Sequence, residues 1–360
     1  MAGQSRWRTL GLLAVLGPAI WLPRGLALDR FVTVDEPSWL TFSGNFYQAL
    51  AHAEFAHTFQ IVHPGVTTTW VGTAALLWRY PAYAKDVPGQ VNWVEQEIGP
   101  FLQAQGHDPV DVLATARAIM VLGITVTLGL ASVAAARLAG FAAALLGFLL
   151  IAADPFHIAL SRVLHVDALA SSLMLLALLA YLNYLHRGRR GRDLVVSGVA
   201  AGLAWLTKVP ALFLVPFIGA LTLRHLWSVR HGPRRVSLGE VGAAARPFVL
   251  WGAVGLLVFV IVWPAMWVDP VTILRTMARD ALGLAKSGHQ EAPLFFNGAI
   301  VRDPGWLFYP ITYLWRTTLS CWPGWHWLRC RSACRGCGRP SGHTGSRRGC
   351  CCSSPCCSPS

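Results

Sequence analysis

The sequence predicts an all-α membrane protein, a polytopic transmembrane helical bundle of about seven to eight spans with a large outer loop that carries interfacial helices. The composition points to this class, because 54% of the residues are hydrophobic and only 13% are charged. Soluble domains carry about a quarter charged residues. The apolar residues also come in long blocks, several of which approach the ~20 residues that a bilayer span requires. We therefore expect the lipid bilayer to be a main partner of the chain.

The basic residues set the expected orientation. The net charge of +13 does not indicate a nucleic-acid partner, because the arginines lie in short clusters between apolar blocks and not in one groove. Clusters of this kind mark cytoplasmic loops. They lie at Arg6 and Arg8, at Arg137, at 187–192 and at 224–246. With all of them inside, the acidic breaks at 35–36, 154–167, 269 and 303 lie outside. The sequence thus predicts a multi-pass protein of the cell (plasma) membrane whose active site faces the non-cytoplasmic side.

The first span is expected in the apolar run Leu10 to Leu28, which follows Arg6 and Arg8. We interpret it as a retained signal anchor, with a cleaved signal peptide as the alternative. Residues 28–112 then form the first outer loop. Its semi-apolar stretch Val66 to Trp78 is expected to lie as a helix at the membrane interface.

Later spans are separated by short polar breaks. They are expected at Leu113 to Ala136, Phe141 to Ala153, Ala168 to Leu185 and Pro247 to Trp267, with a last one near Trp306. The block Leu194 to Leu223 has arginine clusters on both sides and Lys208 with Pro210 in its middle. A helical hairpin with Lys208 at its outer apex keeps both clusters in the cytoplasm, whereas one long tilted helix does not. Residues 269–303 are expected to form a second outer loop.

The chain changes character after residue 320. All nine cysteines lie between Cys321 and Cys357, in a tail that also contains CCC and CC runs. Cys334 and Cys337 have the CxxC spacing of zinc ligands, but a matching second pair is absent. We interpret 321–360 as an unstructured or frameshifted end, and 1–320 as the transmembrane region of a protein that naturally continues with further spans. No cofactor is predicted, and the need for a divalent metal ion is left open.

Two acidic residues follow the first span in the segment FVTVDEPSWL. Asp35 and Glu36 are placed in the outer loop, where a carboxylate can act as a general base toward a hydroxyl group. The alternative is structural, since an aspartate before Pro37 and Ser38 is also typical of a helix start.

The segment SRVLHVD combines Arg162, His165 and Asp167 at positions i, i+3 and i+5. A charge at the bilayer centre costs ~2.5–3.5 kcal/mol even on lenient scales, so these groups either reach water or serve a function. Arginine suits phosphate oxygens, and a salt bridge that steadies a helix end is the alternative.

Three further residues are candidates for binding an anionic ligand. His63 lies in a His-Pro-Gly element and can hydrogen-bond a lipid phosphate, and Lys85 can attract one by its charge. Lys208 adds positive charge if it projects into a cavity beside Arg162; otherwise it reaches out to the interface.

The order of these motifs resembles the GT-C superfamily of membrane glycosyltransferases, and more narrowly the protein O-mannosyltransferase and aminoarabinose transferase group. The motifs are a DE pair after the first span, a His-Pro element, SR followed by Asp167, and GLAWLTKVPA, and the resemblance covers roughly residues 5–320. It implies that Asp35 is the essential carboxylate of the first loop, Asp167 the second acidic position and Lys208 the lysine of the LTK motif. The His-Pro-Gly element differs from the more usual double-proline version.

The resemblance implies transfer of a sugar from a polyprenyl-phosphate donor to a hydroxyl on the outer side, with a protein, lipid or glycan as acceptor. Asp35 is then the catalytic base of a single inverting displacement, and Arg162 with Lys208 or Lys85 neutralises the departing phosphate. The expected substrate-binding residues are Glu36, His63, Lys85, Arg162, His165, Asp167 and Lys208. Two other classes remain open: a transporter or flippase that uses Asp167 and Lys208 as coupling charges, and a non-catalytic membrane subunit.

Overall fold

A computed structural model describes residues 2–61, 63–92, 94–229, 238–287 and 294–316 of the chain. The chain divides into two compact units, Met1–Pro304 and Gly305–Ser360. The predictions for the cysteine-rich tail at 321–360, including the CxxC pair, fall outside the described residues.

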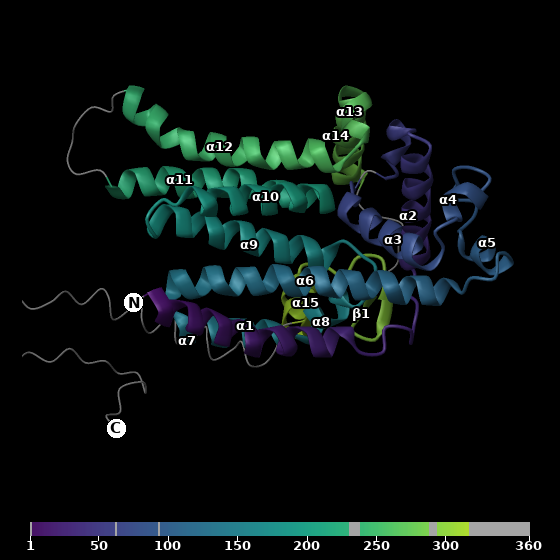
Figure 1. Ribbon diagram of the computed structural model, residues 1–360, viewed down its shortest axis with the longest axis horizontal. Helices are drawn as coiled ribbons and strands as arrows, with labels where there is room; N and C mark the ends of the chain where they lie inside the picture. Colours follow the sequence, from purple (N-terminus) through teal and green to yellow (C-terminus); the bar gives the residue numbers. More distant parts are fainter. Residues whose placement is uncertain (1, 62, 93, 230–237, 288–293, 317–360) are drawn as a thin grey trace, which may run out of the picture. The chain divides into compact units, whose positions relative to one another are not determined.

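The first unit consists mainly of long helices that lie side by side (Figure 1). They are α1 (Ala2–Gly25), α6 (Pro109–Ala139), α7 (Phe141–Ala152), α9 (Asp167–His186), α10 (Gly191–Thr207), α11 (Leu214–Val229) and α12 (Leu238–Val262). Leucine and valine also cover outward faces; on α6, for example, Leu122, Val126 and Leu130 are exposed. A helix that is apolar on all sides suits a position between other helices and lipid.

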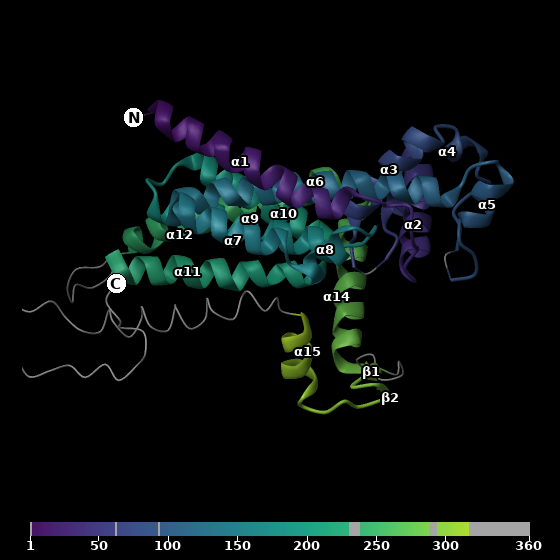
Figure 2. The same cartoon turned by 90° about the horizontal axis from the view of Figure 1, so that it is seen from below.

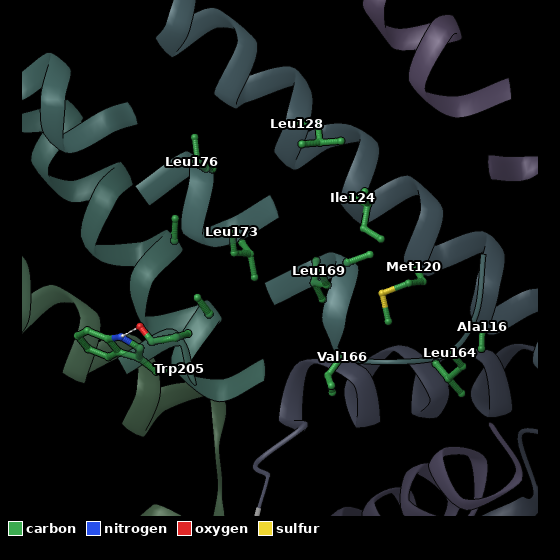
Figure 3. Close-up of a cluster of buried hydrophobic side chains, with 14 of the residues drawn as sticks. Ala116, Met120, Ile124, Leu128, Leu164, Val166, Leu169, Leu173, Leu176 and Trp205 are labelled. Atoms are coloured by element: carbon green, nitrogen blue, oxygen red, sulfur yellow. Dashed lines mark hydrogen bonds between the residues drawn. The ribbon is translucent and has the colours of Figure 1, made fainter. Parts of the chain in front are cut away.

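The core lies where α6 packs against α9, and Figure 3 shows this contact. Apolar residues repeat along one face of α6 every four residues, so they project from it in a row. The row is Ala116, Met120, Ile124 and Leu128, and it meets Leu169, Leu173 and Leu176 of α9. The spans that the sequence predicted at 113–136 and 168–185 therefore form the centre of the bundle.

Four described helices are long and apolar enough to cross a membrane. They are Pro109–Ala139, Asp167–His186, Val209–Trp227 and Ala245–Val262. A fifth results if α7 and α8 (Pro155–Ser161), which meet at an angle of 66°, count as one broken span. The expected number of about seven to eight is not confirmed in the described part of the chain. One reason is length, because α10 has 17 residues and spans only ~25 Å at 1.5 Å per residue.

The hairpin predicted around Lys208 is present. Helix α10 ends at Thr207, Lys208 is extended with φ −155° and ψ 136°, and the short helix η2 (Val209–Phe213) follows. Pro210 prevents α10 from continuing, because proline lacks the N–H that the next turn needs. Helix α11 then returns along the bundle, as Figures 1 and 2 both show.

The close approach of α10 and α12 depends on glycine. A side chain at Gly198 would come within 2.9 Å of the Trp251 carbonyl oxygen, and one at Gly202 would overlap the Gly255 carbonyl. This Gly-x-x-x-Gly spacing places both glycines on one face of α10, so the two backbones can touch. Helix α12 thereby lies directly against the arm of the hairpin that leads to Lys208.

The predicted first outer loop is folded and not extended. It contains α2 (Glu36–Ala51), η1 (Phe55–Thr58), α3 (Val66–Arg79), α4 (Tyr83–Asp86) and α5 (Gly99–Ala104). Helix α3 coincides with the predicted interfacial stretch, and one face of it packs on α2, α6 and α10. Its opposite face is open, with Trp78 79% exposed.

The predicted second outer loop begins after α12. It contains α13 (Ala265–Val268) and α14 (Pro270–Ser287), and Figure 2 shows that α14 runs across the direction of the bundle helices. An antiparallel hairpin of β1 (Leu294–Phe296) and β2 (Ala299–Val301) follows, which the all-α prediction missed. Its turn residues Asn297 and Gly298 both have positive φ, as a two-residue type I′ turn requires. In the second unit, α15 (Phe308–Arg316) is the described helix.

Candidate active site

Asp35 lies immediately before α2 with its side chain 70% exposed. It occupies the N-cap position, yet its carboxylate makes no capping hydrogen bond to the helix. The helix start is instead favoured by Pro37 in its first turn, because proline is already restricted to helical φ. The alternative, that Asp35 serves only to start the helix, explains its position in the chain. It does not explain the carboxylate group, which makes no capping hydrogen bond.

His165 links Asp35 to a second carboxylate. Its Nε2 atom lies 3.7 Å from Oδ2 of Asp35, and its Nδ1 atom lies 3.3 Å from Oδ2 of Asp167. The other oxygen of Asp167 accepts a hydrogen bond from the ammonium group of Lys208. These four residues, from three distant segments of the chain, thus form a row in which acidic and basic groups alternate. We call this row the acid–base row.

Local structure explains why the row can form. His165 belongs to the short turn between α8 and α9, Asp167 begins α9, and Lys208 is the residue at which α10 gives way to η2. Thr207, one residue earlier, is tied to Thr67 at the start of α3 by a 2.8 Å hydrogen bond between their hydroxyls. The apex of the hairpin is thereby attached to the start of α3, in the predicted first outer loop.

The His-Pro-Gly element lies beside the row. Gly65 has φ +54°, and a side chain there would overlap the ring of Trp39. Trp39 in turn meets the ring of His165 edge-on, with the centroids 6.0 Å apart. The structure therefore places the half-buried His63 in a turn that packs on the wall of the site.

Glu36 has a different environment from its neighbour Asp35. It is completely buried, and its carboxylate forms a bidentate ion pair with Arg117 of α6, with N–O distances of 2.7 and 2.5 Å. The same carboxylate accepts hydrogen bonds from the hydroxyl and backbone N–H of Thr33 and from the backbone N–H of Leu164. Burial by itself raises the pKa of Glu36, but the hydrogen bonds from Arg117, Thr33 and Leu164 lower it below its ordinary value.

The buried ion pair of Glu36 and Arg117 stabilises the backbone around the site. Glu36 follows Asp35 in the chain, and the N–H that it binds belongs to Leu164, the residue before His165. Arg117 also donates to the carbonyls of Leu28 and Phe31, in the segment that leads to Asp35. One buried ion pair therefore fixes the backbone on both sides of the gap between Asp35 and His165.

The structure does not bring Arg162 and Lys85 into the acid–base row. The guanidinium group of Arg162 donates to the carbonyls of Pro23, Leu26 and Ala27, where α1 ends. Free carbonyls at a helix end need such donors. Lys85 is exposed on α4.

Arg117 and Trp39 were missed from the sequence. A signal for Arg117 was available, because it is the one charged residue well inside the apolar block 113–136, and such a charge needs a partner. A similar residue is Arg24, which is completely buried and donates to the carbonyls of Ile20, Ala152 and Ile151. Nothing in the sequence marked Trp39 as a residue of the site, apart from its position shortly after the DE pair.

The predicted cytoplasmic clusters lie at the other end of the hairpin arm. Arg137 forms a bidentate ion pair with Asp193, with N–O distances of 2.6 and 2.8 Å. Asp193 lies in the first turn of α10 and Lys208 follows its last residue, so about 22 Å of helix separates them. The arginine clusters and the acid–base row are therefore at opposite ends of α10. Within the described residues, no group of three or more histidine, cysteine or acidic side chains is arranged to hold a metal ion.

Comparison with known proteins bears on the family resemblance and the fold. Residues 111–263, less than half of the chain, match the family model described as dolichyl-phosphate-mannose-protein mannosyltransferase. The solved structures include the S. cerevisiae protein O-mannosyltransferase Pmt1-Pmt2 complex bound to the sugar donor, which matches with a TM-score of 0.53 and 17% sequence identity. The resemblance to the GT-C glycosyltransferase superfamily is confirmed.

These matches cover only part of each protein. The structural match covers 72% of this chain and 33% of the yeast chain, and at 17% identity it shows the fold alone. No curated protein matches the sequence. The family match covers Arg117, His165, Asp167 and Lys208 but not Asp35. The fold and the multi-pass membrane character are therefore supported by comparison, and the site chemistry has to be argued from the chain itself.

Proposed function

We propose that this GT-C chain transfers a sugar from a polyprenyl-phosphate donor to a hydroxyl acceptor on the outer face of the membrane, with inversion at the anomeric carbon. The observation that carries the proposal is the acid–base row, in which an exposed carboxylate is connected through His165 and Asp167 to a lysine at one end of the helical bundle. The description of the matched family names mannose as the sugar, dolichyl phosphate as the carrier and protein as the acceptor. We propose the same classes of donor and acceptor here.

We assign the role of general base to Asp35. A general base needs an accessible lone pair near the acceptor, and a positioned base contributes roughly 10²- to 10⁴-fold in rate. Asp35 is exposed and uncommitted to helix capping, whereas both oxygens of Glu36 are already engaged by buried donors. In the proposed step the acceptor oxygen bonds to the anomeric carbon while its proton passes to Asp35. The bond from that carbon to the phosphate oxygen breaks, and the phosphate leaves with the electron pair.

We assign the leaving phosphate to Lys208. Its ammonium group is partly exposed and bound to one carboxylate oxygen, so it can also attract a second anion. A lysine acts on phosphate as a point charge and stabilises the negative charge that develops as the phosphate departs. Arg162 is a weaker candidate, because its guanidinium group is bound to three backbone carbonyls at the end of α1.

An apolar groove supports a lipid carrier. It has a volume of about 570 Å³ and lies between α9 and the η2–α11 arm. Its walls are Met174, Leu175, Leu178, Phe213, Leu214, Pro216, Phe217 and Ala220. Met174 lies seven residues after Asp167 along α9, which corresponds to ~10 Å. A donor whose phosphate lies at Lys208 would therefore find an apolar channel for its isoprenoid chain about two helical turns deeper in the bundle.

The outer-face assignment rests on charge. The arginine clusters at 137 and 187–192 lie at the opposite end of α10 from Lys208, and lysine and arginine in short loops favour the cytoplasmic side. We therefore propose that the acid–base row faces outward, where a polyprenyl-phosphate sugar and a translocated protein can meet.

The proposed function is tested with the variant Asp35→Asn. Membranes that contain the full chain are incubated with radiolabelled polyprenyl-phosphate mannose and a peptide rich in serine and threonine. We expect wild-type membranes to label the peptide and release free polyprenyl phosphate. The variant should lose transfer by at least about 10²-fold, because the amide cannot accept the proton, while its abundance in the membrane stays the same.

Asp29→Asn is the matched control, because Asp29 is an exposed carboxylate in the same segment and is expected to be dispensable. Full transfer by Asp35→Asn would remove Asp35 from the mechanism. A wild-type chain that moves the donor across the bilayer without releasing lipid phosphate would instead indicate a flippase. A chain that does neither would indicate a non-catalytic subunit.

A further inference from the structure

The imidazole of His165 occupies an unusual position between two carboxylates. Asp35 approaches its Nε2 atom and Asp167 approaches its Nδ1 atom, at 3.7 and 3.3 Å. The side chain is 20% exposed, and Trp39 borders one edge of the ring. A histidine that only packed against its neighbours would not need both nitrogens directed at acids.

We propose that His165 is a proton relay that receives the acceptor's proton from Asp35 and thereby couples the general base to departure of the phosphate. The proposal rests on the proposed function, because it takes Asp35 as the base. His165 contacts Asp35 and not the substrate, so it is a positioning and relay residue.

The geometry assigns a direction to the proton. Nδ1 lies 3.3 Å from an oxygen of Asp167 but makes no hydrogen bond in this geometry. Because a carboxylate can only accept, we assign the ring hydrogen to the Nδ1 atom that faces it. The lone pair of Nε2 then points toward Asp35. In the resting state an ionised Asp35 and this lone pair share no proton, and their separation of 3.7 Å exceeds hydrogen-bond distance. When Asp35 takes the proton of the acceptor, it becomes a donor and can close this gap.

Lys208 provides the coupling. At rest the charge of Asp167 is offset by the ammonium group of Lys208. A phosphate that leaves with additional negative charge draws the same ammonium group toward itself. The negative charge of Asp167 is then no longer fully compensated by Lys208. Protonation of His165 gives the ring a positive charge, which compensates it. Proton transfer from Asp35 to His165 is therefore most favourable at the moment when the phosphate departs.

The other charged groups near the ring do not compete for this proton. Glu36 and Arg117, behind Leu164, neutralise each other in a buried ion pair. Arg162, on the same segment as His165, is bound to the carbonyls at the end of α1. His63 is half-buried two residues before Gly65, whose backbone packs on the ring of Trp39. The groups that face the two ring nitrogens are thus Asp35 from the start of α2 and Asp167 from α9.

The proton balance is complete without a further reactant. The acceptor O–H proton moves to an oxygen of Asp35 and then to Nε2 of His165, which gives an imidazolium between two carboxylates. After the products leave, the imidazolium returns the proton to water, which reaches the exposed side of Asp35. Lys208 returns to Asp167, and the acid–base row is restored.

The test uses His165→Gln and His165→Ala in the full chain, with the same labelled donor and peptide. Glutamine keeps hydrogen-bonding capacity but cannot carry a proton, and alanine leaves space for a small base. We expect kcat to fall about 10²-fold in both variants, with KM for the donor within about twofold of wild type. Free imidazole should restore much of the activity of His165→Ala. It should restore neither His165→Gln nor Asp35→Asn.

His57→Ala is the matched control, because His57 is an exposed histidine that pairs with Glu54 on the surface. Wild-type kcat in His165→Gln would overturn the relay while leaving the proposed function intact. So would a loss in His165→Ala that imidazole does not restore, since that loss is structural. A wild-type chain that transfers no sugar would overturn both, so the two failures are distinguishable.

Discussion

At the scale of single residues, two neighbouring carboxylates have opposite environments. Asp35 is exposed and faces His165, whereas Glu36 is buried against Arg117. The difference follows from the start of α2, which directs one side chain outward and the next toward α6. The two neighbouring residues can therefore have different roles. Glu36 stabilises the backbone of the site, and Asp35 remains available for chemistry.

We predict that Arg117→Met destabilises the protein severely. Removing one partner of a buried ion pair leaves an uncompensated charge, which costs about 3–5 kcal/mol. The measurement is thermal unfolding of the purified chain in detergent, compared with wild type at pH 7. Transfer activity should fall together with stability, because the same pair fixes the backbone beside Asp35 and His165.

The pH dependence of the stability lost in Arg117→Met serves as the control for this prediction. The folded-state pKa of Glu36 is lowered, so the stability that its charge contributes is present at neutral pH and is lost as the pH falls through that lowered value. The difference between wild type and Arg117→Met should therefore shrink below pH ~4, under the ordinary pKa of glutamate. A difference that stays constant from pH 7 to pH 3 would show that packing, and not charge, dominates at Arg117.

At the scale of elements, the hairpin of α10 and α11 combines two tasks. Its apex presents Lys208 to the acid–base row, and its returning arm forms one wall of the apolar groove. Because both features belong to one hairpin, the position of a donor's phosphate and the path of its lipid chain are linked by the short helix η2.

We predict that Ala220→Trp weakens the binding of long-chain donors. Ala220 lines the groove and is exposed, so an indole there fills space that the proposed isoprenoid chain would occupy. Each buried methylene is worth ~0.8 kcal/mol, so displacing two or three raises KM by roughly tenfold or more. The measurement is KM for polyprenyl-phosphate mannose donors of increasing chain length.

The matched control is Ala143→Trp, an exposed alanine on α7 that does not line the groove. Donors with one or two isoprene units should be used equally well by wild type and Ala220→Trp, because their chains end before the obstruction. An equal rise in KM for short and long donors would contradict the assignment of the groove to the lipid chain.

At the scale of the whole molecule, the charges are distributed between two ends of the first unit. The ion pair of Arg137 with Asp193 lies at one end of α10, and the acid–base row lies at the other. In a membrane this separation would set the side on which the proposed sugar transfer occurs. The mechanism depends on it, since the acceptor has to reach Asp35.

We predict that the two ends lie on opposite sides of the membrane, with the acid–base row outside. An epitope inserted after Gly89, in the first outer loop, should be accessible in intact cells. The same epitope inserted after Gly188, between α9 and α10, should become accessible only after permeabilisation. The reverse pattern would place Asp35 in the cytoplasm and contradict the proposed chemistry.

Much of the fold could be predicted because its causes are local in sequence. Long apolar blocks predict the spans that became α6 and α9, and Pro210 with flanking arginines predicts a hairpin at Lys208. The number of spans was less predictable, because apolar composition does not reveal how long each helix becomes: α7 has 12 residues and α10 has 17. The Asn297-Gly298 hairpin was overlooked because its strands are only three residues long.

What the sequence by itself determined is the membrane class and the order of the motifs, since hydropathy acts through composition alone. Only the tertiary structure decided which side chains meet. It paired Glu36 with Arg117, set His165 between Asp35 and Asp167, and directed Arg162 to the end of α1. The physical reason is that these contacts join residues from separate helices, and a contact of this kind depends on how helices pack, which leaves no mark in the local sequence.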